Sequence, residues 1–125
     1  MKHVVDSSGW IEYFTNGPNA EFYAPVINDP ENLLVPSIVL YEVFKHVLLH
    51  SDEENALQSV AIMARATEVP LDRDIALEAA LVSTGFKLAM ADSIILATAR
   101  FRQAELWTQD AHFQKIEGVH FIEKK

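Results

Sequence analysis

Short runs of apolar residues, each about the length of one β-strand, alternate along this chain of 125 residues with longer segments of helical periodicity. Strands separated by helices pair in parallel, so the alternation predicts an α/β fold with helices on both faces of a mostly parallel sheet. No linker, repeat or low-complexity segment divides the chain, and we expect one domain over residues 1–125. Strands are expected at residues 3–5, 33–35, 106–108 and 119–122, with a short edge strand at 68–71.

Helical patterns fill the segments between these strands. Ser7 or Ser8 can cap the first helix, and Ser51 with Glu54 matches a capping box at the start of the fourth. Gly85 is expected to end the fifth helix. Helices are expected over residues 7–14, 19–28, 37–48, 51–63, 72–85 and 90–102, with a short one at 111–116.

Composition excludes several kinds of site. The chain has no cysteine, so it can hold no disulfide, thiolate nucleophile or iron–sulfur cluster. With 10 Lys and Arg against 18 Asp and Glu, the net charge is −8, which argues against a surface that binds nucleic acid mainly by neutralising phosphates. A nuclease is not excluded, because its metal site is itself built of carboxylates.

The N-terminus and the apolar segments favour a soluble, cytoplasmic protein. Asp6 follows only two apolar residues, too few for a signal peptide. Charged residues interrupt the longest apolar segments well before the roughly 18 residues that a membrane span needs. The four glycines match neither glycine-rich nucleotide-binding fingerprint.

Two acidic residues directly follow expected strands. Asp6 comes after residues 3–5, and Asp110 comes shortly after residues 106–108. Functional sites of parallel sheets form beyond the carboxyl ends of the strands, so both carboxylates can face one crevice. Taken singly, each is equally explained as a helix cap or a turn residue.

Two further acids lie within apolar helical segments. Asp92 interrupts a run that should be buried, where an ionised carboxylate needs a partner, a metal or a capping role. Glu42 lies in the middle of a helix, where Lys45 or His46 can pair with it as ordinary surface neighbours. Four carboxylates from four segments can share one cleft if a hard divalent cation lies among them, and oxygen ligands favour Mg²⁺ or Mn²⁺.

Four segments together resemble the motifs of PIN-domain ribonucleases, and the closest resemblance is to the VapC toxins of toxin–antitoxin pairs. It extends in order over nearly the whole chain. The segments are Val4-Val5-Asp6-Ser7-Ser8, Tyr41-Glu42-Val43, Ala91-Asp92-Ser93-Ile94-Ile95-Leu96-Ala97-Thr98-Ala99 and Thr108-Gln109-Asp110-Ala111-His112-Phe113.

This resemblance implies a three-layer α/β/α fold, often as a homodimer, and an endoribonuclease that uses Mg²⁺ or Mn²⁺. The cation would be held by Asp6, Glu42, Asp92 and Asp110, one of them through water. Ser7 and Thr108 match hydroxyl residues that position a carboxylate or a water beside the metal. In the family a metal-activated water attacks the phosphodiester and leaves a 5′-phosphate and a 3′-hydroxyl.

The sequence departs from the family pattern at His112, where many relatives carry a further acid. The substitution removes one charge and leaves the number of metals open. A single histidine is weak evidence of function, so His112 can contact phosphate or be a plain surface residue.

Other functions remain as alternatives. Glu42, His46 and His50 fall on one helix face and could form a zinc site, but no glutamate beside the first histidine could serve as its base. A receiver-like signalling module is acidic and of this length, yet it needs paired acids where this chain has Asp6 followed by serines. A non-catalytic PIN-fold binding module is the remaining alternative.

The expected partners are RNA and a cognate antitoxin. Cations at the rim of the acidic cleft could contact RNA, although solubility explains each of them as well. Aromatic residues of the first two helices could form a groove for the antitoxin, although core packing explains most of them. The cations are Lys45, Lys87, Arg100 and Arg102, and the aromatic residues are Trp10, Tyr13, Phe14 and Phe22.

Overall fold

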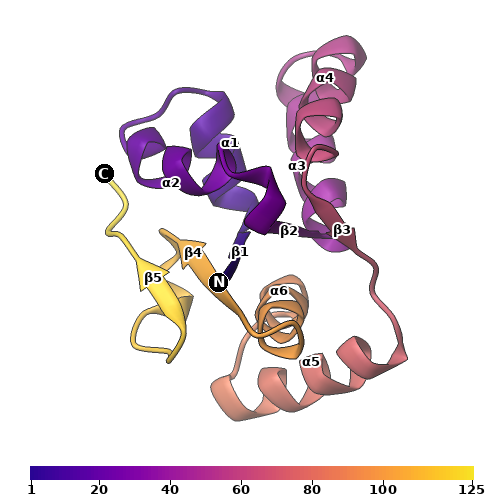
Figure 1. Cartoon of the computed structure of the whole chain (residues 1–125), viewed down its shortest axis with the longest axis vertical. Coiled ribbons are helices and arrows are strands. Elements are labelled where there is room, and N and C mark those ends of the chain that lie inside the picture. The colour runs from indigo at the N-terminus through magenta and orange to yellow at the C-terminus, as the bar shows by residue number, and fades with distance from the viewer.

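The computed structural model describes every residue from Met1 to Lys125, and its centre is a five-stranded sheet (Figure 1). The strand order is β3-β2-β1-β4-β5, and all four pairings are parallel. The expected mostly parallel sheet is therefore confirmed, and the carboxyl ends of its strands lie along one edge. The strands are β1 (Lys2–Val5), β2 (Leu33–Pro36), β3 (Thr67–Val69), β4 (Ala104–Thr108) and β5 (Val119–Phe121).

Six α-helices connect the strands and cover both faces of the sheet. In Figure 1, α1 and α2 lie on one side of the sheet, α5 and α6 lie on the opposite side, and the α3–α4 hairpin stands beside β2 and β3. This is the three-layer α/β/α arrangement. The helices are α1 (Ser7–Phe14), α2 (Ala20–Ile27), α3 (Ser37–His50), α4 (Glu53–Met63), α5 (Arg73–Phe86) and α6 (Met90–Phe101).

The central strands and α6 form the core. Val4, Val5 and Leu106 in the strands are fully buried, as expected for a parallel sheet covered on both faces. In α6 every residue from Ser93 to Ala99 is buried, so this helix passes through the interior. No single helix has the length and apolar character to cross a membrane, and one bent pair, α5 with α6, meets those criteria together.

Several element ends differ from the sequence predictions because a neighbouring residue makes the cap. Asp6, rather than Ser7 or Ser8, caps α1 by accepting a hydrogen bond from the backbone N–H of Gly9. Asp52 caps α4 in place of the expected box that starts at Ser51.

Three further predictions of element bounds were wrong. Gly85 does not end α5, which continues to Phe86 and closes at Lys87 in a left-handed conformation. The short helix expected at 111–116 is only a 3₁₀ turn at Ala111–Phe113. The edge strand occupies 67–69 rather than 68–71.

Candidate metal centre

All four predicted acids line one cavity of about 170 Å³ at the carboxyl edge of the sheet. Each comes from a different place in the chain: the end of β1, the middle of α3, the first turn of α6 and the segment after β4. The topology therefore gathers side chains that are far apart in the sequence. The lining residues are Asp6, Ser7, Ser8, Glu42, Asp92, Ile95 and Asp110.

Asp6 is the most buried of these acids, with 4% of its surface exposed. Its Oδ2 accepts a 2.5 Å hydrogen bond from the Thr108 hydroxyl, and its Oδ1 accepts one of 2.9 Å from Gly9 N–H. Burial raises the pKa of Asp6 to about 6, although these hydrogen bonds act in the opposite direction. The carboxylate is held rigidly, in a place where its negative charge is costly.

The backbone around Asp6 depends on close packing. A Cβ added at Gly9 would lie 2.5 Å from Cε1 of Tyr23 and 2.6 Å from Cγ1 of Val5. Only glycine therefore lets the start of α1 approach β1 and α2 closely enough to place its N–H against Asp6.

Glu42 is held by a residue of another helix. The Ser7 hydroxyl in α1 donates a 2.6 Å hydrogen bond to its Oε1. Glu42 does not form the surface ion pair with Lys45 or His46 that the sequence allowed. The Nζ atom of Lys45 lies instead 5.7 Å from the centre of the Tyr41 ring. Ser7 is thus a positioning contact for the carboxylate.

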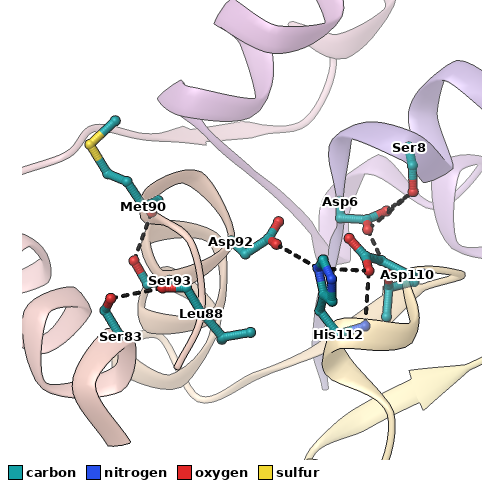
Figure 2. A network of polar contacts seen from close by, with 10 residues as sticks. Asp6, Ser8, Ser83, Leu88, Met90, Asp92, Ser93, Asp110 and His112 are labelled. Carbon is teal, nitrogen blue, oxygen red and sulfur yellow. Dashed lines mark hydrogen bonds and ion pairs between the residues drawn. The ribbon is translucent and has the colours of Figure 1, made fainter. Parts of the chain in front are cut away.

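Asp92 projects from the first turn of α6 without capping that helix, whose N-cap is Ala89. Burial, reinforced by the nearby charge of Asp110, raises its pKa. Its only polar contact is His112, whose Nδ1 lies 3.5 Å from Oδ2 of Asp92. Figure 2 shows the imidazole between Asp92 and Asp110.

Asp110 is fixed by the turn that follows β4. Its backbone N–H donates to the Thr108 hydroxyl at 2.9 Å, and the same hydroxyl donates to Asp6. Its Oδ1 accepts a hydrogen bond from His112 N–H at 2.9 Å. Asp6 and Asp110 therefore both cap a helical turn and both line the cavity. The capping role and the role in the site, which the sequence offered as alternatives, are both present for each acid.

Two further residues contact the acids. Ser8, interpreted only as a cap, places its hydroxyl 3.2 Å from both oxygens of Asp6. His112, which does not line the cavity itself, forms with Asp92 and Asp110 a group whose potential metal-binding atoms all lie within 4.8 Å of one another. The sequence signal for Ser8 was its place beside Asp6, and the signal for His112 was its departure from the family pattern.

The alternative zinc site on α3 does not assemble. The rings of His46 and His50 stack with centroids 4.1 Å apart, and His50 Nδ1 is bonded to the backbone oxygen of His46. A receiver-like module is also excluded by the sheet order, which places β1 between β2 and β4.

The four candidate rim cations occupy different positions. Lys45 shares the wall of a second cavity with Glu42 and so lies beside this one acid. Arg100 follows Asp92 by eight residues of one helix, which places it about 12 Å away along the axis. Arg102 caps the same distant end, and Lys87 closes α5.

The aromatic residues of α1 and α2 mostly belong to the core. Trp10 is 1% exposed and stacks on Phe14, so the expectation that it is an exposed docking residue is wrong. Tyr13 and Phe22 are partly buried and pack against the same core.

Comparison with known proteins agrees with this architecture. The toxin–antitoxin complex from Klebsiella pneumoniae has a chain with a TM-score of 0.80 and 23% identity, covering 95% of this chain and 96% of that one. VapBC2 from Rickettsia felis, bound to a promoter DNA fragment, has a TM-score of 0.76 and 15% identity, and the match covers 98% of both chains. Mycobacterium tuberculosis VapC20, described as a Sarcin-Ricin loop cleaving toxin, has a TM-score of 0.75 and 14% identity. The match covers 94% of this chain and 97% of that one.

These identities establish similarity of fold. No match was found among curated proteins. The sequence itself matches the family model described as "PIN domain" over residues 3–119, which is nearly the whole chain and includes all four acids of the cavity. The chain therefore belongs to the PIN domain family.

Proposed function

We propose that this protein is a metal-dependent endoribonuclease and the toxin of a toxin–antitoxin pair. The observation that carries the proposal is the convergence of four carboxylates from four elements on one cavity. A fold gains no stability from such an arrangement, because like charges close together repel. A divalent cation among the four carboxylates removes this repulsion and is bound by their oxygens.

The donors present fit a hard divalent cation such as Mg²⁺ or Mn²⁺. Ligand atoms of Asp92, Asp110 and His112 already lie within the reach of one ion. Burial raises the pKa values of Asp6 and Asp92, so a cation beside these carboxylates would favour their ionised form. Asp6, Glu42, Asp92 and Asp110 would together hold the ion, with Glu42, which is already bonded to Ser7, acting through water.

The protein supplies rigidity to this reaction. Thr108 holds Asp6 on one side and the backbone of Asp110 on the other, so these two carboxylates keep a fixed relation. Ser7 fixes Glu42 in the same manner. A bound cation would activate a water for attack on a phosphodiester and stabilise the charge that develops on its oxygens, leaving a 5′-phosphate and a 3′-hydroxyl.

The partners are proposed from similar proteins and from the surface. Two of the similar structures are toxin–antitoxin complexes, which favours an antitoxin partner in the cytoplasm. A third is described as cleaving the Sarcin-Ricin loop, which favours an RNA substrate. An apolar surface on α5 and α6 favours a homodimer. Its exposed residues are Leu77, Leu81, Phe86, Met90 and Phe101.

The test is cleavage of a mixed pool of structured RNA by the purified protein, with Mn²⁺ or Mg²⁺ and with EDTA. We expect cleavage that needs the metal, leaves 5′-phosphate ends and disappears in Asp92→Asn. Glu117→Gln, which removes an exposed charge that does not line the cavity of the acids, serves as the control and should cleave normally. A folded protein that neither cleaves RNA nor binds either metal would instead be a non-catalytic PIN-fold binding module.

A further inference from the structure

We propose that His112 is a direct ligand of the cation through Nδ1, and that it biases the site toward Mn²⁺ over Mg²⁺. This inference rests on the proposed metal-dependent function. It assigns a role to the histidine whose ring lies against two of the four acids.

The position of the imidazole results from two separate contacts. The contact with Asp110 is local, since Nδ1 lies 3.3 Å from Oδ1 of a residue two positions earlier. The backbone N–H of His112 donates to the same oxygen and fixes the 3₁₀ turn. This contact alone would be expected from the turn geometry.

The contact with Asp92 is not local, because it joins the turn after β4 to the first turn of α6. Nδ1 lies 3.5 Å from Oδ2 of Asp92, and the half-buried Asp92 carboxylate has no other hydrogen-bond or ion-pair partner. The same nitrogen therefore faces one oxygen of each acid, as Figure 2 shows. Neighbouring ligand atoms around one small cation lie about 3 Å apart, which these separations approach.

The exposure of His112 argues that its place is not set by core packing. Its side chain is 71% exposed, compared with 22% for Asp92 and 31% for Asp110. The histidine therefore lies at the surface, where its two carboxylate neighbours are its polar contacts. Its two polar neighbours are carboxylates that we assign to the metal.

The chemistry of the nitrogen sets the metal preference. Carboxylate and water oxygens suit Mg²⁺, whereas imidazole binds first-row transition metals better. A neutral imidazole ligand carries one negative charge less than a carboxylate, which weakens Mg²⁺ binding most. It also offers a nitrogen donor that Mn²⁺ accepts. The expected result is a larger ratio of Mn²⁺ to Mg²⁺ affinity than an all-carboxylate site would have.

The experiment measures metal binding and not activity. The full-length protein is titrated with Mn²⁺ or Mg²⁺ by calorimetry at about pH 8, where imidazole side chains are generally neutral. The Mn²⁺ form is then examined by electron spin echo envelope modulation for coupling to ¹⁴N of a bound imidazole. The variants are His112→Ala, His112→Gln and His112→Asp, with His50→Ala as a matched control that removes an exposed histidine bonded only within its own helix.

We expect ¹⁴N coupling in the wild type and in His50→Ala, and its loss in His112→Ala and His112→Gln. Mn²⁺ affinity should fall by about tenfold in His112→Ala, the scale of effect known for residues that support metal sites, while Mg²⁺ affinity changes less. His112→Asp should move the preference toward Mg²⁺. Melting curves without metal confirm that each variant folds.

Two other outcomes separate the inference from the proposed function. Binding of Mn²⁺ that Asp92→Asn abolishes, with no ¹⁴N coupling and no effect of His112→Ala, would overturn the role of His112 and leave the nuclease proposal intact. Failure of the wild-type protein to bind Mn²⁺ at all, or equal binding by Asp92→Asn, would overturn both.

Discussion

A single carboxyl group, that of Asp6, carries two opposed physical effects. Three donors stabilise its ionised form: the hydroxyls of Ser8 and Thr108 and the backbone N–H of Gly9. Burial opposes ionisation and is the larger effect, so the pKa lies near 6 rather than near the usual value of about 3.9. At neutral pH the metal-free fold therefore carries an ionised group that it would hold more favourably as the neutral acid.

This imbalance predicts a pH-dependent effect of Asp6→Asn on the metal-free protein. Because the pKa is higher in the folded state, Asp6 contributes stability below about pH 4, and that contribution is lost as the pH rises through about 6. Asparagine does not titrate. The free energy of unfolding of the variant, relative to wild type, should therefore rise by about 2 kcal/mol between pH 4 and pH 7.

Urea unfolding in EDTA at several pH values measures this difference. Any constant cost of the lost Thr108 hydrogen bond shifts the whole curve and leaves its slope with pH unchanged. A difference for Asp6→Asn that does not change with pH would contradict the assigned burial effect.

At the scale of elements, the order of strands and helices could be predicted from the sequence, whereas their ends could not. Apolar periodicity reports which face is buried, and this is a property of many residues together. A cap depends on one residue among several that are chemically suitable. Ser51 and Asp52 are both good caps, and only the backbone geometry selects Asp52.

The end of α5 is a second case in which the sequence did not predict the capping residue, and it supports a prediction about stability. Gly85 lies inside the helix, where glycine is unfavourable, and a methyl group added there would meet no neighbouring atom. Lys87 has a φ of 58°, a backbone conformation that glycine adopts without strain. Gly85→Ala and Lys87→Gly should each raise the free energy of unfolding by about 0.5–1 kcal/mol. Urea unfolding checks both, and a loss of stability in Lys87→Gly would show that its side chain has a compensating contact.

At the scale of the whole molecule, the four acids and the two hydroxyl residues Ser7 and Thr108 could be recognised from the sequence, but which acid each hydroxyl orients could not. Ser7 with Glu42 and Thr108 with Asp6 join residues 35 and 102 positions apart. His112 is informative only once α6 and the turn after β4 are placed side by side. A single histidine has no periodicity or spacing from which such a contact could be inferred.

The mutual repulsion of the acids predicts stabilisation by metal. A cation that binds only the folded state at about 100 times its Kd adds about 2.7 kcal/mol, so Mn²⁺ should raise the Tm measurably. Asp92→Asn should show a much smaller increase on adding Mn²⁺, because a ligand and a charge are lost, whereas Glu117→Gln should respond as wild type does. Differential scanning calorimetry with Mn²⁺ and with EDTA measures the shifts, and equal shifts in all three proteins would contradict a metal centre at Asp92.

The distribution of cations over the molecule predicts which of them contacts RNA. Lys45 lies beside Glu42, whereas Arg100 lies at the other end of α6 from Asp92. In Asp92→Asn, which should not cleave, adding Lys45→Ala should weaken RNA binding a few-fold and reduce its dependence on salt by about one phosphate contact. Arg100→Ala in the same background is the control, and an equal loss there would mean that Lys45 has no special role. Fluorescence anisotropy of a labelled RNA measures both.

The hydrogen bond between Thr108 and Asp6 joins the last third of the chain to its first strand. During synthesis, β1 and α1 leave the ribosome long before β4 and the turn that carries Asp110. No shorter nascent chain contains the paired carboxylates or the hydroxyl that orients them. The proposed metal centre is therefore complete only after β4 and the turn that carries Asp110 have been synthesised and β4 has paired with β1.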